Sequence, residues 1–239
     1  MSAKSWVWEH TKTALRRRGI EVSGTRWSIR QRRQRMLSHY GVDVLLDVGA
    51  NIGQYATEVR EAGYRGVIHS YEPLSGPFQE LLAASRNDPS WQAHQIAVGD
   101  STGRITINIS EATKFSSALP MAERAREESP DAACVGTEDV ALDTLDNLAA
   151  DVAAANLGLK IDVQGYEGAV LDGGEKTLQR TRFLEMELSP RPVYEGQLLM
   201  LEALERLDGL GFVLSCTENI YPVPHTGRSW QFNGIFIRE

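Results

Sequence analysis

The sequence feature that most constrains the fold is a glycine-containing turn at residues 47–53, which lies between an apolar run and a helix-like segment. The run 44–48 is apolar on both faces, as expected for a strand buried inside a parallel sheet. The segment 54–62 has the pattern of a helix and is followed by Gly63. In open α/β sheets, a strand–turn–helix unit of this kind places a ligand at the carboxyl end of the strand.

Strand-like and helix-like segments alternate through most of the chain, which predicts right-handed βαβ units and a parallel sheet. Beyond the first unit, the expected strands are residues 66–71, 92–98, 158–163 and 182–187, and the expected helices are 77–85, 166–173 and 198–210. The last two apolar segments, 212–216 and 232–237, flank a long loop and are predicted to form an antiparallel pair.

The middle of the chain has a different pattern. Residues 104–109 alternate polar and apolar side chains, which predicts a half-buried strand. Residues 120–138 are charged and rich in alanine, and we expect a mobile loop or a short helix there. Regular structure is expected to return at residues 141–145.

The glycine turn lacks the pattern of a dinucleotide-binding fold. Such folds use Gly-x-Gly-x-x-Gly, but Asn51 and Gln54 occupy the second and third glycine positions here, so a pyrophosphate would lose its close approach to the backbone. Glu72 follows the second strand, where a carboxylate can accept hydrogen bonds from both hydroxyls of a ribose. The pattern therefore favours a nucleoside ligand without phosphates over a nicotinamide cofactor.

Several segments together resemble the FkbM-type methyltransferases. The main ones are residues 46–53, 71–73 and 160–167, of which the last is the most specific. Residues 97–100, 116–117 and 142–146 are similar to the same family, and the likeness extends over roughly residues 43–239. The resemblance implies a Rossmann-like class I methyltransferase fold: an α/β domain with a seven-stranded, mostly parallel sheet and a C-terminal antiparallel hairpin.

The resemblance also implies S-adenosylmethionine as the cofactor and a hydroxyl of a sugar or polyketide as the acceptor. The positions that match the family's cofactor site fall into three groups. They are Asp47, Gly49, Asn51 and Gly53 at the methionine part, Glu72 at the ribose, and Ala97 and Val98 near the adenine.

Methyl transfer to a hydroxyl needs a base, because the hydroxyl loses its proton as it attacks. Asp162 is the first candidate, since it ends the strand that is expected to lie beside residues 44–48; the alternative is a buried acid paired with Lys160 or a backbone amide. Glu187 is the second candidate and His225 the third. The alternative for Glu187 is an acid held in a salt bridge, and the alternative for His225 is a histidine that is merely exposed.

Other polar and aromatic residues allow further interpretations. Asp143, Asp162 and Glu187 could gather around a divalent ion, but no ligand spacing supports this and we expect no metal. Tyr221, Trp230 and Phe232 either face a sugar or pin the hairpin to the core. Ser116 and Ser117 either bind a ligand hydroxyl or cap a turn.

The charge is unevenly distributed. The chain carries a net charge of −7, but residues 1–40 hold ten Lys and Arg against two acidic residues. We expect a basic helical extension at 1–40 and a methyltransferase domain at 41–239. Such a basic segment can contact an anionic membrane surface, but a solvated helix face that lies against an acidic body is the simpler explanation. An acidic body argues against a nucleic-acid partner.

No apolar run is long enough to span a bilayer, no signal peptide is visible, and the two cysteines match no metal spacing. We therefore expect a cytoplasmic protein with free thiols, and the basic extension suggests a peripheral position at the inner membrane face. The favoured function is an O-methyltransferase acting on a sugar hydroxyl in a glycolipid or another secondary metabolite. The alternatives are an NAD-dependent oxidoreductase and a non-catalytic nucleoside-binding module.

Overall fold

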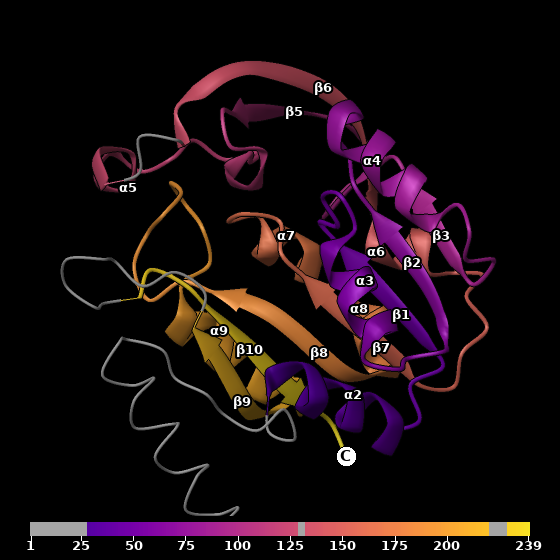
Figure 1. Ribbon diagram of the computed structural model, residues 1–239. Helices are drawn as coiled ribbons and strands as arrows, with labels where there is room; N and C mark the ends of the chain where they lie inside the picture. The colour runs from indigo at the N-terminus through magenta and orange to yellow at the C-terminus, as the bar shows by residue number, and fades with distance from the viewer. Residues whose placement is uncertain (1–27, 129–131, 220–228) are drawn as a thin grey trace, which may run out of the picture.

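The computed structural model describes residues 28–128, 132–219 and 229–239 (Figure 1). Helices and strands alternate along most of this length, as the sequence predicts. In chain order they are α2 (Ile29–His39), β1 (Val44–Val48), α3 (Gln54–Glu61), β2 (Val67–Tyr71), α4 (Ser75–Ser85), β3 (Trp91–His94), β4 (Ala97–Gly99), β5 (Gly103–Ser110), the 3-10 helix η2 (Thr113–Phe115), α5 (Glu123–Glu128), β6 (Cys134–Thr144), α6 (Leu145–Leu148), β7 (Leu157–Ile161), α7 (Glu167–Asp172), α8 (Glu175–Arg180), β8 (Thr181–Leu188), α9 (Met200–Gly209), β9 (Val213–Asn219) and β10 (Phe232–Ile237).

The main sheet has seven strands in the order β3-β2-β1-β7-β8-β10-β9. Strands β1, β2, β3, β7 and β8 are parallel, and β10 runs antiparallel to both β8 and β9. The predicted class I methyltransferase sheet with its C-terminal hairpin is therefore confirmed. The chain order reverses between β1 and β7, and this switch point is where open α/β sheets bind their ligands.

Helices cover both faces of this sheet (Figure 1). On one face, α2, α3 and α4 bury Leu37, Val59 and Leu81 against strand residues such as Leu45. On the other face, α6 to α9 pack on a separate core that includes Leu159. The strand β1 is buried along its whole length because both of its faces are covered.

A second, three-stranded sheet in the order β4-β6-β5 was not predicted. The expected single strand at 92–98 is wrong: the chain leaves the main sheet after His94, and β4 pairs with β6 instead. The segment 120–138 contains the expected short helix, but strand structure begins already at Cys134. Strands β5 and β6 arch over the carboxyl ends of the main sheet (Figure 1).

Helix α2 packs on the main sheet as part of the same core. Leu37 is fully buried there, and the Arg33 guanidinium forms a buried two-bonded ion pair with Glu185 of β8. The predicted boundary at residue 40 would assign α2 to the extension, although its Leu37 is part of the core beside the main sheet. Residues 1–27 of the predicted extension lie outside the described part of the chain. Within the described ranges, no helix has the length and hydropathy needed to cross a membrane.

Candidate functional site

A cavity of about 510 Å³ opens at the switch point between β1 and β7. Its walls come from the loops after β1, β2 and β7, from β5 of the second sheet, and from β8, α2 and α3. Seven of the predicted site residues line it together: Gly49, Asn51, Glu72, Ala97, Val98, Asp162 and Glu187. The structure therefore brings these seven residues together at one cavity, although not every predicted site residue lines it.

The glycine turn has the sharp geometry that its sequence predicts. Gly49 has a φ of +76°, and a Cβ atom there would lie 1.8 Å from the backbone oxygen of Asp162, so no other residue fits. Asn51 adopts a φ of +49°, which non-glycine residues rarely take outside functional loops. Gly53 also has a positive φ but packs on Trp91 outside the cavity, so it shapes the turn rather than lining the site.

Glu72 is held beside this turn by two backbone amides. The amide of Asn51 donates to Oε2 and the amide of Leu74 donates to Oε1, each at 2.9 Å. Burial raises the pKa of Glu72 to about 7, although the two amides oppose this rise. The carboxylate keeps free lone pairs on the cavity side.

One end of the cavity is largely apolar. Ala97 and Val98 line it as predicted, and Ile105 and Ile107 of β5 face them. Sequence reasoning missed the two isoleucines because the sequence pattern did not show that β5 lies over the carboxyl ends of the main sheet. A flat apolar group fits between these walls.

Ser116 and Ser117 line the same cavity, but their hydroxyls also support the protein. The Ser117 hydroxyl donates to the backbone oxygen of Gln164 at 2.5 Å, and the Ser116 hydroxyl accepts from the Ser110 amide. These contacts favour the interpretation in which both serines shape loops.

Asp47 does not reach the cavity, contrary to the expectation that it touches a ligand. Its side chain is fully buried, accepts a hydrogen bond from Ser70, and lies 3.3 Å from the Lys160 ammonium. Lys160 in turn donates to the Gly49 carbonyl at 2.7 Å. Burial opposes the charge on Lys160, but the carboxylates of Asp47 and Asp162 raise its pKa. Asp47 therefore supports the glycine turn from behind, through Lys160.

Two acids meet at the polar side of the cavity, and Gln164 joins them. Its side-chain amide nitrogen donates to Asp162 Oδ1 at 2.7 Å and to Glu187 Oε2 at 3.1 Å, while its amide oxygen accepts from Tyr194. Burial raises the pKa of Glu187 well above its usual range, and the charges of Asp162 and Glu167 add to this. The Asp162 side chain is 33% exposed and is therefore the more accessible acid.

Sequence reasoning missed Gln164 as a site residue. Its φ of +54° makes it, with Asn51, one of two non-glycine residues in the described chain with a positive φ, and both line the cavity. The only available sequence signal was its place between Asp162 and Gly165 in the most specific of the family-like segments.

Other predicted residues lie elsewhere. His225 and Tyr221 fall outside the described residues. Asp143 does not line the cavity, and its Oδ1 accepts from Thr102 and Asn147, so the three acids considered as metal ligands do not meet. Trp230 packs on an apolar cluster around Tyr194, as the structural interpretation of the late aromatic residues predicts.

The model of the methyltransferase FkbM domain matches residues 47–214. This chain belongs to the FkbM methyltransferase family. The methyltransferase is 26% identical over 179 residues to a 2-O-methyltransferase, NoeI, of Sinorhizobium fredii, covering 71% of this chain and 73% of the relative. The chain is accordingly an S-adenosylmethionine-dependent methyltransferase, which decides against the NAD-dependent oxidoreductase and the non-catalytic module.

Solved structures with a similar outline include a precorrin-6y C5,15-methyltransferase of Geobacter metallireducens, with a TM-score of 0.46, 11% identity, and coverage of 91% of this chain and 93% of that one. An rRNA methylase of Streptococcus thermophilus has a TM-score of 0.47, 10% identity, and coverage of 86% and 93%. The strand order of the main sheet carries the fold assignment by itself.

The cavity fits S-adenosylmethionine, the cofactor of the family. Its volume lies in the range that holds a ligand of this size. Ala97 and Val98 at the apolar end could hold the adenine ring, and the Glu72 carboxylate could accept from the hydroxyls of the ribose. The turn at Gly49 and Asn51 brings the backbone close to the cavity between this end and the acid pair.

Proposed function

We propose that this methyltransferase methylates a hydroxyl oxygen of a sugar, within a glycolipid or another secondary metabolite. The observation that carries the proposal is the acid pair Asp162 and Glu187, joined by Gln164 at the polar side of the cavity. A hydroxyl acceptor needs such a group because its proton must leave as the oxygen attacks. The name of the Sinorhizobium fredii relative, a 2-O-methyltransferase, supports oxygen as the acceptor atom.

S-adenosylmethionine, when bound, supplies an electrophilic methyl carbon whose bond to sulfur breaks with both electrons going to sulfur. Asp162 takes the proton of the acceptor hydroxyl on its carboxylate. The Lys160 ammonium lies 3.8 Å from Asp162 Oδ2, on the side of the glycine turn. Burial raises the pKa of Glu187 well above its usual range, which favours a carboxyl that donates a hydrogen bond to a second oxygen of the acceptor and orients it.

The remaining site residues bind and align the two substrates. Glu72 accepts from the ribose hydroxyls, and Ala97 and Val98 contact the adenine. Gly49 and Asn51 contact the methionine part through the backbone, while Asp47 and Gly53 act on the turn from outside the cavity. His225 remains the third candidate base. The sugar acceptor is supported by the density of hydrogen-bonding side chains at the polar side of the cavity.

The decisive experiment compares Asp162→Asn with the native chain in single-turnover methyl transfer. We expect the rate to fall by about 10²- to 10⁴-fold, the usual effect of losing a general base, with unchanged affinity for S-adenosylmethionine. Asparagine can still accept from Gln164, so the local structure should survive. A rate within threefold of the native value would remove Asp162 as the base.

The acceptor can be named by mass spectrometry of extracts from a strain that lacks the gene. A sugar-containing species lighter by one methyl group would support the proposal, and a lighter species without a sugar would contradict it.

The glycolipid context and membrane contact rest on the basic composition of residues 1–40. They can be tested by removing residues 1–27, which leaves α2 in place. Binding to anionic vesicles that survives this deletion would separate the basic segment from membrane contact.

A further inference from the structure

The cavity continues past the acid pair along a row of polar side chains across three strands. Asn233 of β10 lies directly opposite Glu187 of β8 on one side and Glu218 of β9 on the other. Directly opposed residues of antiparallel strands point to the same face, and all three line the cavity. Since neighbouring strands are about 4.8 Å apart, the row extends about 10 Å from the acid pair.

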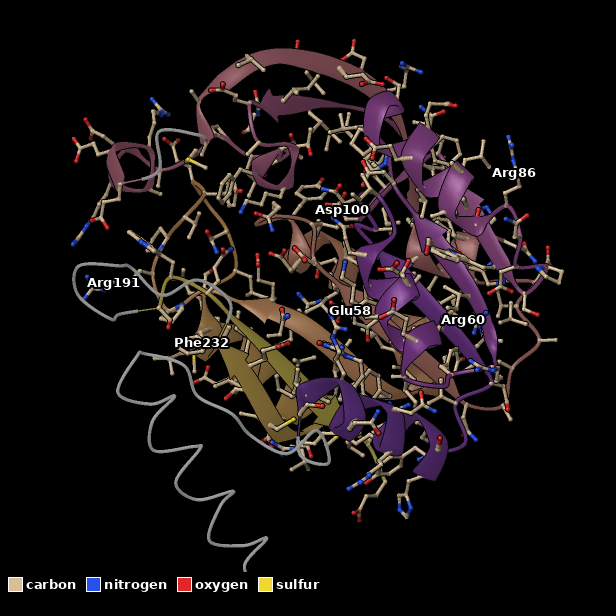
Figure 2. The ribbon with its side chains drawn as sticks, in the orientation of Figure 1. Glu58, Arg60, Arg86, Asp100, Arg191 and Phe232 are labelled. Atoms are coloured by element: carbon tan, nitrogen blue, oxygen red, sulfur yellow. The ribbon has the colours of Figure 1, made fainter. Side chains whose placement is uncertain are left out.

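Two helices form the wall beside this row. Arg33 of α2 lies with Nη2 3.6 Å from Glu218 Oε2, and its Cζ is stacked 4.8 Å from the ring centre of Tyr55 on α3. Glu58 of α3, labelled in Figure 2, also lines the cavity. The row and this wall together give the cavity a polar end that is distinct from its apolar, adenine-facing end.

Arg33 has hydrogen-bonding capacity left at this end. Its Nε and Nη2 both donate to Glu185, but the buried Nη1 forms no hydrogen bond within the described chain, and its contact to Glu58 Oε2 is 3.6 Å long. The Arg33 side chain is 4% exposed, so bulk solvent barely reaches it. An unused donor in a buried position beside a cavity calls for a ligand oxygen.

The charges at this end select among ligands. Arg33 is paired with Glu185, and Glu58 is paired with Arg30 at 2.8 Å. Among the described residues, Glu218 is therefore the carboxylate at this end without a close ion pair of its own. A phosphate or carboxylate ligand would meet the like charge of Glu218 there. A sugar hydroxyl can donate to a carboxylate and accept from an amide or guanidinium at the same time.

Three of these residues lie outside the segment that matches the family model. Arg33 precedes residues 47–214, and Glu218 and Asn233 follow them. The cofactor-binding turn and the acid pair lie inside that segment. The polar end of the cavity is therefore formed in part by α2, β9 and β10, and these three residues lie outside the segment that the family model matches.

We propose that Arg33, Glu218 and Asn233 form a second acceptor subsite that binds hydroxyls of the sugar unit next to the methylated one. The proposal rests on the proposed function and makes the acceptor an uncharged saccharide of at least two units. Glu218 and Asn233 contact the second unit, and Arg33 holds Glu218 in position while its Nη1 donates to that unit.

The test uses the full-length chain, methyl-tritiated S-adenosylmethionine and a panel of saccharides. The panel contains monosaccharides and disaccharides of glucose, galactose, rhamnose, fucose and N-acetylglucosamine, with the corresponding sugar phosphates and uronic acids. We expect methyl transfer to neutral disaccharides with kcat/KM at least fivefold above that for the matching monosaccharides, as the loss of one hydrogen bond predicts.

Two variants locate the effect. Asn233→Ala and Glu218→Ala should each raise the KM for the disaccharide about fivefold and leave kcat for the monosaccharide and the KM for S-adenosylmethionine unchanged. Glu205→Ala, an exposed glutamate of α9, is the matched control and should change none of these values. The thermal unfolding midpoint of each variant separates a loss of binding from a loss of folding.

The outcomes are distinguishable. A preference for phosphorylated or acidic sugars, or equal rates on monosaccharides and disaccharides in a chain that methylates sugars, overturns the subsite and leaves the proposed function intact. Methyl transfer to no saccharide in the panel overturns both.

Discussion

Glu72 offers the sharpest test of the cofactor site, because its role depends on both geometry and charge. Its two carboxylate oxygens each accept one backbone amide, from Asn51 and from Leu74. In Glu72→Gln, one oxygen becomes an NH₂ group that must face a donor. That substitution leaves one buried amide unpaired and removes one acceptor from the ribose.

The expected cost follows from these contacts. An unsatisfied buried donor costs about 1–3 kcal/mol, and a hydrogen bond to a charged acceptor is worth a similar amount. The cost that is already present in the free protein does not change the affinity; only the lost hydrogen bond to the ribose and any added cost in the complex do. Because about 1.4 kcal/mol corresponds to a factor of ten, we expect the Kd for S-adenosylmethionine to rise by about 10- to 100-fold.

The pH dependence gives a second, independent readout. Burial raises the pKa of Glu72 to about 7, and the ionised form is the one that accepts from both hydroxyls. Native affinity should therefore be highest above pH 7 and should fall by up to tenfold per pH unit below it. The glutamine variant should lack this dependence.

Isothermal titration calorimetry between pH 6 and pH 8.5 measures both effects. S-adenosylhomocysteine, which lacks the sulfonium charge, should show the same loss if Glu72 binds the ribose. Glu80→Gln, an exposed acid on α4, is the control. Native-like affinity in Glu72→Gln, or a flat pH profile in the native chain, would refute the ribose assignment.

Three further predictions concern stability. Arg33→Met should destabilise the fold by about 3–5 kcal/mol in urea unfolding, because the buried Glu185 carboxylate loses its cation and keeps only the hydrogen bond from Tyr55. The added change Glu185→Met should recover most of this loss, and additive effects of the two changes would contradict the ion pair. Burial raises the pKa of Glu167 to about 7. The free energy of unfolding of the native chain, relative to that of Glu167→Gln, should therefore decline by about 1.4 kcal/mol per pH unit from pH 4.5 to pH 7 and then level off. A difference that stays constant with pH would contradict the raised pKa. Burial lowers the pKa values of His69 and His94, whose ring nitrogens lie 3.1 Å apart. The thermal unfolding midpoint of the native chain should therefore fall as the pH drops below about 6.5, and the midpoint of His94→Gln should fall less. Equal falls in the two chains would contradict this prediction.

Local patterns in the sequence determined the class of fold and the place of the site. The apolar strand 44–48, the glycine turn after it and Glu72 nineteen residues beyond Gly53 are all short-range features. A buried strand, a sharp turn and a helix start each follow from neighbouring residues. The convergence of the glycine turn and Glu72 on one cavity could be predicted because these units meet at one edge of a parallel sheet.

Only the tertiary structure decided what individual polar residues do. Asp47 and Glu72 both lie close to the carboxyl end of a strand in the sequence, yet Asp47 points inward to Lys160 while Glu72 lines the cavity. Arg33 and Glu185 are 152 positions apart and meet because α2 packs across β8.

The second sheet and the polar row beside Asn233 were likewise beyond the sequence pattern. The direction in which β4 leaves the main sheet, and the register that sets Asn233 opposite Glu187 and Glu218, depend on packing between distant segments. Side-chain periodicity shows which face of an element is buried, but it contains no information about which other element covers that face.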